Sequence, residues 1–355
     1  MKEEFTETRG CLVSAVLAGS WRNSNSPSLK ISESQLDEVT PLLYGSGAGA
    51  LAWWRVRVSE LRTTASALVL QQVYRLQVLQ SEIHAEKIQK VFLILRQASI
   101  EPLLVKGWAA SSLYPEHGLR PYGDIDLLVR PEDYKIAAEL LARPETKDCW
   151  VDLHEQFSEL ADRPIAKLFE RSELRPLGEG TARVLSREDH LALMAIHLLK
   201  HGAWRPLWLC DIAAAVEALP PTFDWDICLG PTDRLAGWIK AVIGLARDLL
   251  RADTDHLPAS IKAGEQPSWL IAAVRKEWQN PFAANQPPMR HPLPIADQLK
   301  SVAGLFGALR ERWPNPIIAT VSVNGAFNGF PRFPYQLGNC ALRAARLLWR
   351  SPASG

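Results

Sequence analysis

The chain has 355 residues, of which 47% are hydrophobic and 22% are charged, as is usual for a globular protein. Its length allows two domains, or one domain with large helical additions. The formal net charge of +1 argues against the broad basic surface of a general nucleic-acid or DNA binder, although it leaves room for a local basic pocket.

The cysteines and the N-terminus bear on the compartment of the protein. The five cysteines form no CxxC pair and no spacing typical of metal ligands, which favours free thiols in a reducing cytosol. The first ten residues, MKEEFTETRG, carry acids where a signal peptide carries positive charge. No apolar run approaches the roughly 18 residues that span a bilayer. We therefore predict a cytoplasmic protein with no membrane partner.

The N-terminal part is predicted to be helical after an irregular start. Residues 1–34 are expected to be partly loop, because residues 19–34 are rich in Ser, Asn and Pro. Residues 35–100 are predicted to be helical, and between residues 60 and 98 apolar residues recur three and four apart. Turn residues are scarce there, so the pattern predicts one long helix or two helices in succession.

Residues 101–180 are predicted to form a compact core that contains the strands. Three strands are expected in the runs IEPLLVKG, DIDLLV and DCWVDLHEQF. A brief helix that stops near Pro115 follows the first strand, and a helix opened by Pro131 follows the second. This block, about residues 101–157, is the only part of the chain in which the pattern predicts strands.

Helices are predicted again in the C-terminal part. Residues 186–278 form a helical domain that begins at Ser186, with Asp189 three residues later as an approximate capping box. Residues 279–355 combine a Pro-rich connection with helices in ADQLKSVAGLFGALRER and CALRAARLLWR. The predicted fold class is therefore α+β, a small sheet embedded in predominantly helical N- and C-terminal regions.

Two carboxylates stand at the start of the second strand, in LRPYGDIDLLVR. Because side chains alternate along a strand, Asp124 and Asp126 point the same way, with Cα atoms roughly 6.5 Å apart. Carboxylates so placed repel each other unless a cation lies between them. Mg²⁺ prefers such oxygen ligands, and Asp152 on the next strand is the candidate third carboxylate.

Nearby residues could bind the phosphates of a nucleotide. Lys106 and Arg120 would supply positive charge, and Gly107 and Gly123 would allow the backbone to approach closely. The alternative without a functional role is that Asp124 and Asp126 belong to a solvated turn after Gly123. Asp126 is harder to explain in that way, because apolar residues surround it and an unpaired charge in a core strand is costly.

The stretch LLVKGWAASSLYPEHGLRPYGDIDLLVRPED resembles the signature of nucleotidyltransferase family proteins, in an uncharacterised branch of the DNA polymerase beta-like superfamily. Lys106-Gly107, then Leu119 to Val129, then Asp152-Leu153-His154 match its motifs in order. The segment HLALMAIHLLKHGAWRPLWLCDIAAAV also resembles the helical part of that family, and the similarity covers most of residues 35–350.

The resemblance implies a small mixed-sheet nucleotidyltransferase core that uses an NTP and two Mg²⁺ ions (or Mn²⁺). It implies that Asp124, Asp126 and Asp152 are both the catalytic residues and the metal ligands. This chain has Gly107-Trp108 where better-known members of the superfamily carry Gly-Ser. The segment between the helix at residues 133–142 and Asp152 is also shorter than in relatives.

Several polar residues of the helical part have two interpretations each. His197 and His201 lie one turn apart, and an interface between this helix and the core is favoured over a zinc site. Lys200 or His201 could reach a triphosphate. Asp211 is expected in a structural salt bridge, with Arg205 as the candidate partner. His154 shares a face with Asp152 and could orient it, or could be a core histidine.

The leading functional hypothesis is a metal-dependent enzyme that transfers an NMP from an NTP to a hydroxyl or similar acceptor and releases pyrophosphate. A small molecule or a peptide or protein side chain is favoured over RNA as the acceptor, because the net charge is near zero. One alternative is a binding or scaffold protein built on a decayed transferase fold, which the short segment before Asp152 favours. Another is a toxin-like transferase that acts on tRNA.

Overall fold

The computed structural model describes residues 8–116, 118–262, 264–280 and 313–349, and its N-terminal part is helical. These elements are α1 (Arg9–Leu17), α2 (Glu33–Gly45), α3 (Gly49–Val56), the 3₁₀ turn η1 (Glu60–Thr63) and α4 (Ala65–Gln97). Residues 35–100 are mainly helical, as predicted, and the stretch from residue 60 to residue 98, expected as one long helix or two in succession, holds η1 and the single long helix α4. The chain turns after α2, where Gly47 adopts a φ of +78°, and the Thr64 hydroxyl caps a new helix.

The central part of the chain forms one sheet with short helices between its strands. Its strands are β1 (Leu103–Leu104), β2 (Ile125–Leu128), β3 (Val151–His154), β4 (Glu173–Leu177) and β5 (Gly180–Val184). Its helical elements are α5 (Gly107–Ser111), η2 (Pro131–Asp133), α6 (Tyr134–Leu141), η3 (Ser158–Leu160) and α7 (Ile165–Arg171). The three predicted strands and the two predicted helices are confirmed.

The sheet is mixed, and its strand order is β3-β2-β1-β5-β4. Strand β2 pairs antiparallel with β1 and parallel with β3, and the β4–β5 hairpin extends the sheet on the far side of β1. The prediction that strands are confined to residues 101–157 is therefore wrong, because the hairpin adds two. The predicted fold class, α+β with a small sheet core in a mainly helical chain, is confirmed.

The sheet separates two hydrophobic cores. On one face, Leu104, Ile125 and Leu127 pack with residues of α4 and α6. On the other face, Leu103 and Leu128 belong to the large core that the N- and C-terminal helices share. Because side chains alternate along β2, this second face also receives Asp126. The carboxylate therefore points toward the C-terminal helices.

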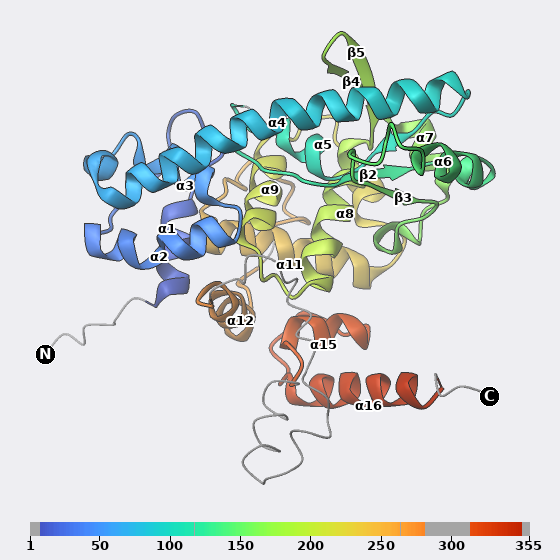
Figure 1. Ribbon diagram of the computed structural model, residues 1–355. Helices are drawn as coiled ribbons and strands as arrows, with labels where there is room; N and C mark the ends of the chain where they lie inside the picture. The colour runs from blue at the N-terminus through green and yellow to red at the C-terminus, as the bar shows by residue number, and fades with distance from the viewer. Residues whose placement is uncertain (1–7, 117, 263, 281–312, 350–355) are drawn as a thin grey trace, which may run out of the picture.

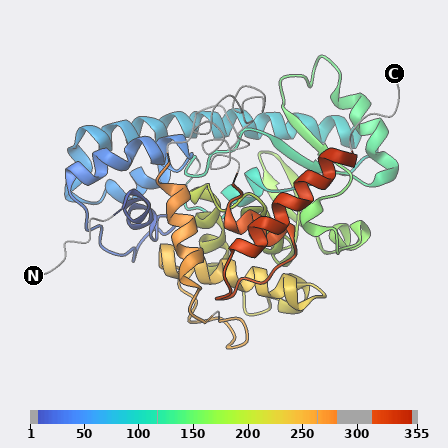
Figure 2. The ribbon, with the colours of Figure 1, turned by 90° about the horizontal axis from the view of Figure 1, so that it is seen from below.

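The C-terminal part is helical, as predicted. It contains α8 (Arg187–Lys200), α9 (Pro206–Glu217), α10 (Trp225–Leu229), α11 (Asp233–Leu250), α12 (Ser268–Trp278), α15 (Pro316–Ser322) and α16 (Phe333–Trp349). The Ser186 hydroxyl accepts a hydrogen bond from the Asp189 amide at the start of α8, which confirms the predicted cap. Helices α15 and α16 lie on the side of the molecule away from α4 (Figures 1 and 2). The helix predicted in ADQLKSVAGLFGALRER lies outside the described residues.

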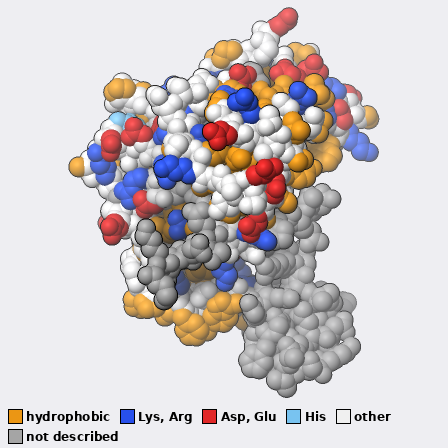
Figure 3. All heavy atoms as spheres, turned by 90° about the vertical axis from the view of Figure 1, so that its left-hand side faces the viewer, with side chains coloured by type: hydrophobic (Ala, Val, Ile, Leu, Met, Phe, Trp, Pro, Cys, Tyr) orange, Lys and Arg blue, Asp and Glu red, His pale blue; other side chains and the backbone are white. Residues whose placement is uncertain are grey.

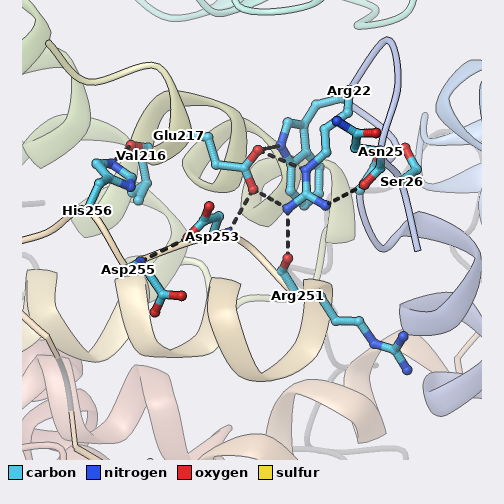
Figure 4. Close-up of polar contacts among 11 residues, drawn as sticks. Arg22, Asn25, Ser26, Val216, Glu217, Arg251, Asp253, Asp255 and His256 are labelled. Carbon is cyan, nitrogen blue, oxygen red and sulfur yellow. Dashed lines mark hydrogen bonds and ion pairs between the residues drawn. The ribbon is translucent and has the colours of Figure 1, made fainter.

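A polar network fastens the N-terminal segment to the C-terminal helices (Figure 4). Glu217, the last residue of α9, accepts hydrogen bonds from the Trp21 indole, the Arg22 guanidinium and the amide of Asp253. Arg22 also donates to the carbonyl of Arg251, just after α11. These contacts hold the loop after α1 against the ends of α9 and α11, so the helical regions form one support for the sheet.

Candidate active site

The register of two strands brings the predicted carboxylates together. Strands β2 and β3 run parallel, with Asp126 directly opposite Asp152. Asp126 is buried, whereas Asp152 at the sheet edge is exposed. Asp124 lies just before β2 and is also exposed. The short segment between α6 and β3 thus still delivers Asp152 to the strand beside Asp126.

A cavity of about 480 Å³ opens between this end of the sheet and α8 and α9. All three aspartates line it, together with most of the residues that the sequence assigned to nucleotide binding. The lining residues are Lys106, Gly107, Arg120, Pro121, Tyr122, Gly123, Asp124, Asp126, Asp152, His197, Arg205 and Trp208. Lys200 and His201, the other two predicted nucleotide contacts, do not line the cavity.

Two of these side chains, Asp126 and Asp152, form with the neighbouring His154 a cluster suited to a metal ion. Ligand atoms of Asp126, Asp152 and His154 all lie within 4.8 Å of one another. The His154 Nε2 atom is 3.1 Å from Asp152 Oδ2 and 3.6 Å from Asp126 Oδ1. Two carboxylates and one imidazole fit a divalent cation such as Mg²⁺ or Mn²⁺. Asp124 lines the same cavity but lies outside this group.

The buried carboxylate of Asp126 is balanced by a lysine. Burial by itself raises the pKa of Asp126, but the neighbouring His154 and Lys106 side chains outweigh it, so the pKa falls below its ordinary value of 3.8. The Lys106 Nζ atom lies 3.3 Å from Asp126 Oδ1. Asp126 is therefore ionised at neutral pH, as a metal ligand must be.

The backbone at Lys106 has an unusual conformation. Its φ of 58° and ψ of −142° lie in a region that residues with a side chain rarely adopt, and Gly107 follows with a φ of 29°. This sharp bend turns the chain from β1 into α5 beside the carboxylates. Strain of this kind persists only where the surroundings enforce it, and it gathers at functional sites.

Arg120 lies on the cavity wall but is engaged by α9. Its guanidinium and the Tyr114 hydroxyl both donate to the buried Asp211 carboxylate, the former with an Nη2–Oδ2 distance of 2.9 Å. The predicted structural salt bridge of Asp211 is confirmed, but its partner is Arg120 instead of Arg205. Whether Arg120 also binds a nucleotide stays a prediction.

Arg205 is a cavity residue that the sequence reasoning missed. Its Nε atom donates to the carbonyl of Ser46, which holds the side chain in place. Burial lowers the pKa of Arg205 to about 10, so the guanidinium is charged at neutral pH. The only local signal for a role at the cavity is the position of Arg205 just before Pro206, which opens α9. The cavity itself is formed by elements that are distant in sequence, so a local pattern cannot reveal it.

The polar residues of α8 join this helix to the core, as predicted. His197 Nδ1 lies 3.2 Å from Glu159 Oε1, and Lys200 donates to the Ser158 hydroxyl. The His201 ring lies 4.4 Å from that of His197, and burial lowers its pKa to about 4, so it is neutral at pH 7. Among the described residues, these histidines belong to no metal-ligand group.

Two serines at the end of α5 do not take the place of the Gly-Ser motif. Ser111, the last residue of α5, donates its hydroxyl to the carbonyl of Trp108, and Ser112, which follows it, donates to the carbonyl of Ala109. Neither side chain lines the cavity with the aspartates.

The surface of the protein carries charges of both signs. Basic and acidic side chains are interspersed on the face that Figure 3 shows. Among the described residues, no helix is both long and apolar enough to cross a bilayer.

Comparisons with curated proteins and with solved structures gave no match. A family model for uncharacterised nucleotidyltransferases matches residues 33–236, which include every residue that lines the cavity. Because this match spans more than half of the chain, the protein belongs to that nucleotidyltransferase family.

Proposed function

We propose that the protein transfers a nucleoside monophosphate from an NTP to a hydroxyl or similar acceptor in a metal-dependent reaction that releases pyrophosphate. The observation that carries the proposal is the parallel register that sets Asp126 opposite Asp152, with Asp124 on the wall of the same cavity. Family membership supports the general reaction class.

The three aspartates would hold divalent cations, Mg²⁺ or Mn²⁺. When bound, such ions would lower the pKa of the acceptor hydroxyl and neutralise charge on the triphosphate. His154 lies among the same oxygen atoms and would add a nitrogen ligand or orient Asp152. The ionised state of Asp126 and the exposure of Asp152 suit this task, because the first can bind without losing a proton and the second can be reached from solvent.

Positive charge for the phosphates would come from Lys106 and Arg205, which line the cavity on different elements. The Lys106 ammonium lies beside the Asp126 carboxylate and neutralises it. A cation bound at Asp126 would take over that role and release Lys106 to contact a phosphate. Gly107 and Gly123 leave room for the triphosphate near the backbone.

The proton balance of the reaction assigns a role to Asp152. As the acceptor oxygen forms its bond to the α-phosphorus and the bond to pyrophosphate breaks, the hydroxyl proton must leave. Asp152 has an exposed carboxylate, with 57% of its side chain accessible, and would accept this proton. Asp126 is the poorer base because its pKa is lowered.

Two aromatic residues, Tyr122 and Trp208, line the cavity beside the charged groups and would flank the nucleoside or the acceptor. The acceptor would enter between the sheet and α8 and α9. A small molecule or a peptide or protein side chain is favoured over RNA, since the net charge is +1 and Figure 3 shows charges of both signs interspersed.

Transfer of label tests the proposal. The purified chain is incubated with each α-³²P-labelled NTP, Mg²⁺ or Mn²⁺, and separate small-molecule, protein and RNA fractions of a cell extract. We expect label in one fraction and equal release of pyrophosphate. Asp152→Asn should abolish both, whereas Asp133→Asn, a matched change in η2 away from the cavity, should not. Metal-dependent NTP binding without any transfer would instead favour the alternative, a decayed binding protein.

A further inference from the structure

The outer face of α4 carries a row of exposed apolar side chains. Leu68, Val69, Leu76, Leu79 and Ile83 are each at least 50% exposed. This apolar stripe extends over about 22 Å of helix at 1.5 Å per residue. Exposed Leu and Val residues are ordinary when scattered singly, but a continuous row on one helix face marks an interaction surface.

Among the described residues, no element packs over the stripe. The opposite face of the helix is already buried, for example through Leu70, Val73 and Ile88. In its N-terminal half α4 packs on α2 and α3, and in its C-terminal half on α6 and β5. Figure 1 shows the helix along the upper edge of the molecule. The apolar stripe therefore remains for a partner.

The spacing of the stripe is that of a coiled-coil helix. Val69, Leu76 and Ile83 are seven residues apart, as the a positions of a heptad are, and Leu79 takes a d position. When two such helices pack antiparallel about an axis between Leu76 and Leu79, Leu76 of each faces Leu79 of the other. Gln72, a polar d position, then lies opposite Ile83 and helps to fix the register.

The charges beside the stripe complement each other in the same arrangement. Arg75 and Glu82 both occupy g positions, and antiparallel pairing places Arg75 of one helix near Glu82 of the other, twice across the axis. Both side chains are exposed. A surface that matches itself in shape and charge is the requirement for a two-fold interface. We propose that the apolar stripe on α4 binds a second copy of this chain to form an antiparallel, two-fold homodimer.

Dimer formation would also support the cavity. The Ser81 carbonyl, on the buried side of α4, accepts a hydrogen bond from the hydroxyl of Tyr122, a residue that lines the cavity. The helix that would form the interface is thus the helix that holds one wall of the candidate active site.

Mass measurement of the full chain by light scattering and sedimentation tests the proposal. We expect a concentration-dependent shift from the 39.5 kDa chain to twice that mass. Leu76→Glu combined with Leu79→Glu should give a monomer at every concentration. Leu93→Glu is the matched control, because Leu93 is about as exposed as Leu76 and Leu79 but lies ten residues beyond Ile83, where the two-fold axis leaves no residue of the partner's α4 opposite it, and it should leave the dimer intact.

A charge exchange tests the orientation. Arg75→Glu alone should weaken the dimer, and Arg75→Glu combined with Glu82→Arg should restore it. The circular dichroism spectrum of each variant must match that of the original chain, which separates loss of the dimer from loss of the fold. A monomeric original chain, a dimer that survives the Leu76 and Leu79 changes, or a failure of the double charge variant to recover would each overturn the proposal.

Discussion

The buried Arg120–Asp211 pair should make a large contribution to stability that a surface pair does not make. Arg120 is 7% exposed and Asp211 2%, and the Tyr114 hydroxyl donates to the same carboxylate. Asp211→Ala would leave a buried guanidinium without its counter-ion and a buried hydroxyl without its acceptor. Breaking one side of such a pair costs about 3–5 kcal/mol. We expect the free energy of unfolding of Asp211→Ala to fall by about that amount.

Urea denaturation measures this loss, provided that the slope of the free energy of unfolding against urea concentration is the same in both proteins. Glu38→Ala removes the exposed pair with Arg9 and is the control, expected to cost at most about 1 kcal/mol. Arg120→Met combined with Asp211→Leu removes both charges and should recover most of the loss. Equal effects of Asp211→Ala and Glu38→Ala would refute the reasoning. If the double variant is stable but binds NTP more weakly, Arg120 contacts the nucleotide in addition to its structural ion pair with Asp211 on α9.

Three further changes test the site itself. Asp126→Asn should abolish binding of NTP with Mg²⁺ or Mn²⁺ in calorimetry, and equal binding by this variant would contradict the metal assignment. His154→Gln should weaken Mn²⁺ binding more than Mg²⁺ binding, because imidazole suits the softer ion; parallel losses would exclude His154 as a ligand. The pKa of Glu159 is held below its ordinary value of 4.5, so its stabilising effect is present above pH 4.5 and lost as the pH falls below it. Glu159→Gln should therefore make the unfolding midpoint less sensitive to acid, and an unchanged acid dependence would argue against that role.

The sequence predicted the carboxylate strands because local pattern and chemistry agreed there. The run Ile125–Val129 is apolar apart from Asp126, and the run around Asp152 alternates apolar and polar residues, so each run indicates a strand and a functional residue at once. The register that sets one opposite the other depends on pairing across about 25 residues, which no local pattern encodes. The parallel pairing follows from the α6 crossover between the two strands.

The β4–β5 hairpin was missed although its turn is visible in the sequence. The run ELRPLGEGTARV has glycines at its centre, but Pro176 and the several charged residues weaken the strand pattern. In the structure β4, which carries Pro176 and two of these charged residues, is the edge strand of the sheet, where charge is tolerated and guards against further pairing. A strand at an edge therefore has a weaker sequence signal than a strand such as β2, which is buried along its whole length.

The sequence could not show which basic side chain of the cavity is best placed to bind a phosphate. That depends on which carboxylate each basic side chain contacts in the folded chain. Arg120 is adjacent to the D-x-D motif in sequence, yet its guanidinium is engaged by Asp211 on α9. Arg205 is far from that motif in sequence, yet it lines the cavity and has no carboxylate partner within ion-pair distance among the described residues. Because Asp211 already engages the Arg120 guanidinium, we expect Arg205 to be the better phosphate ligand of the two. Lys106 is paired with Asp126, as Arg120 is with Asp211, but with a cation bound at Asp126 the Lys106 ammonium would become available for the triphosphate.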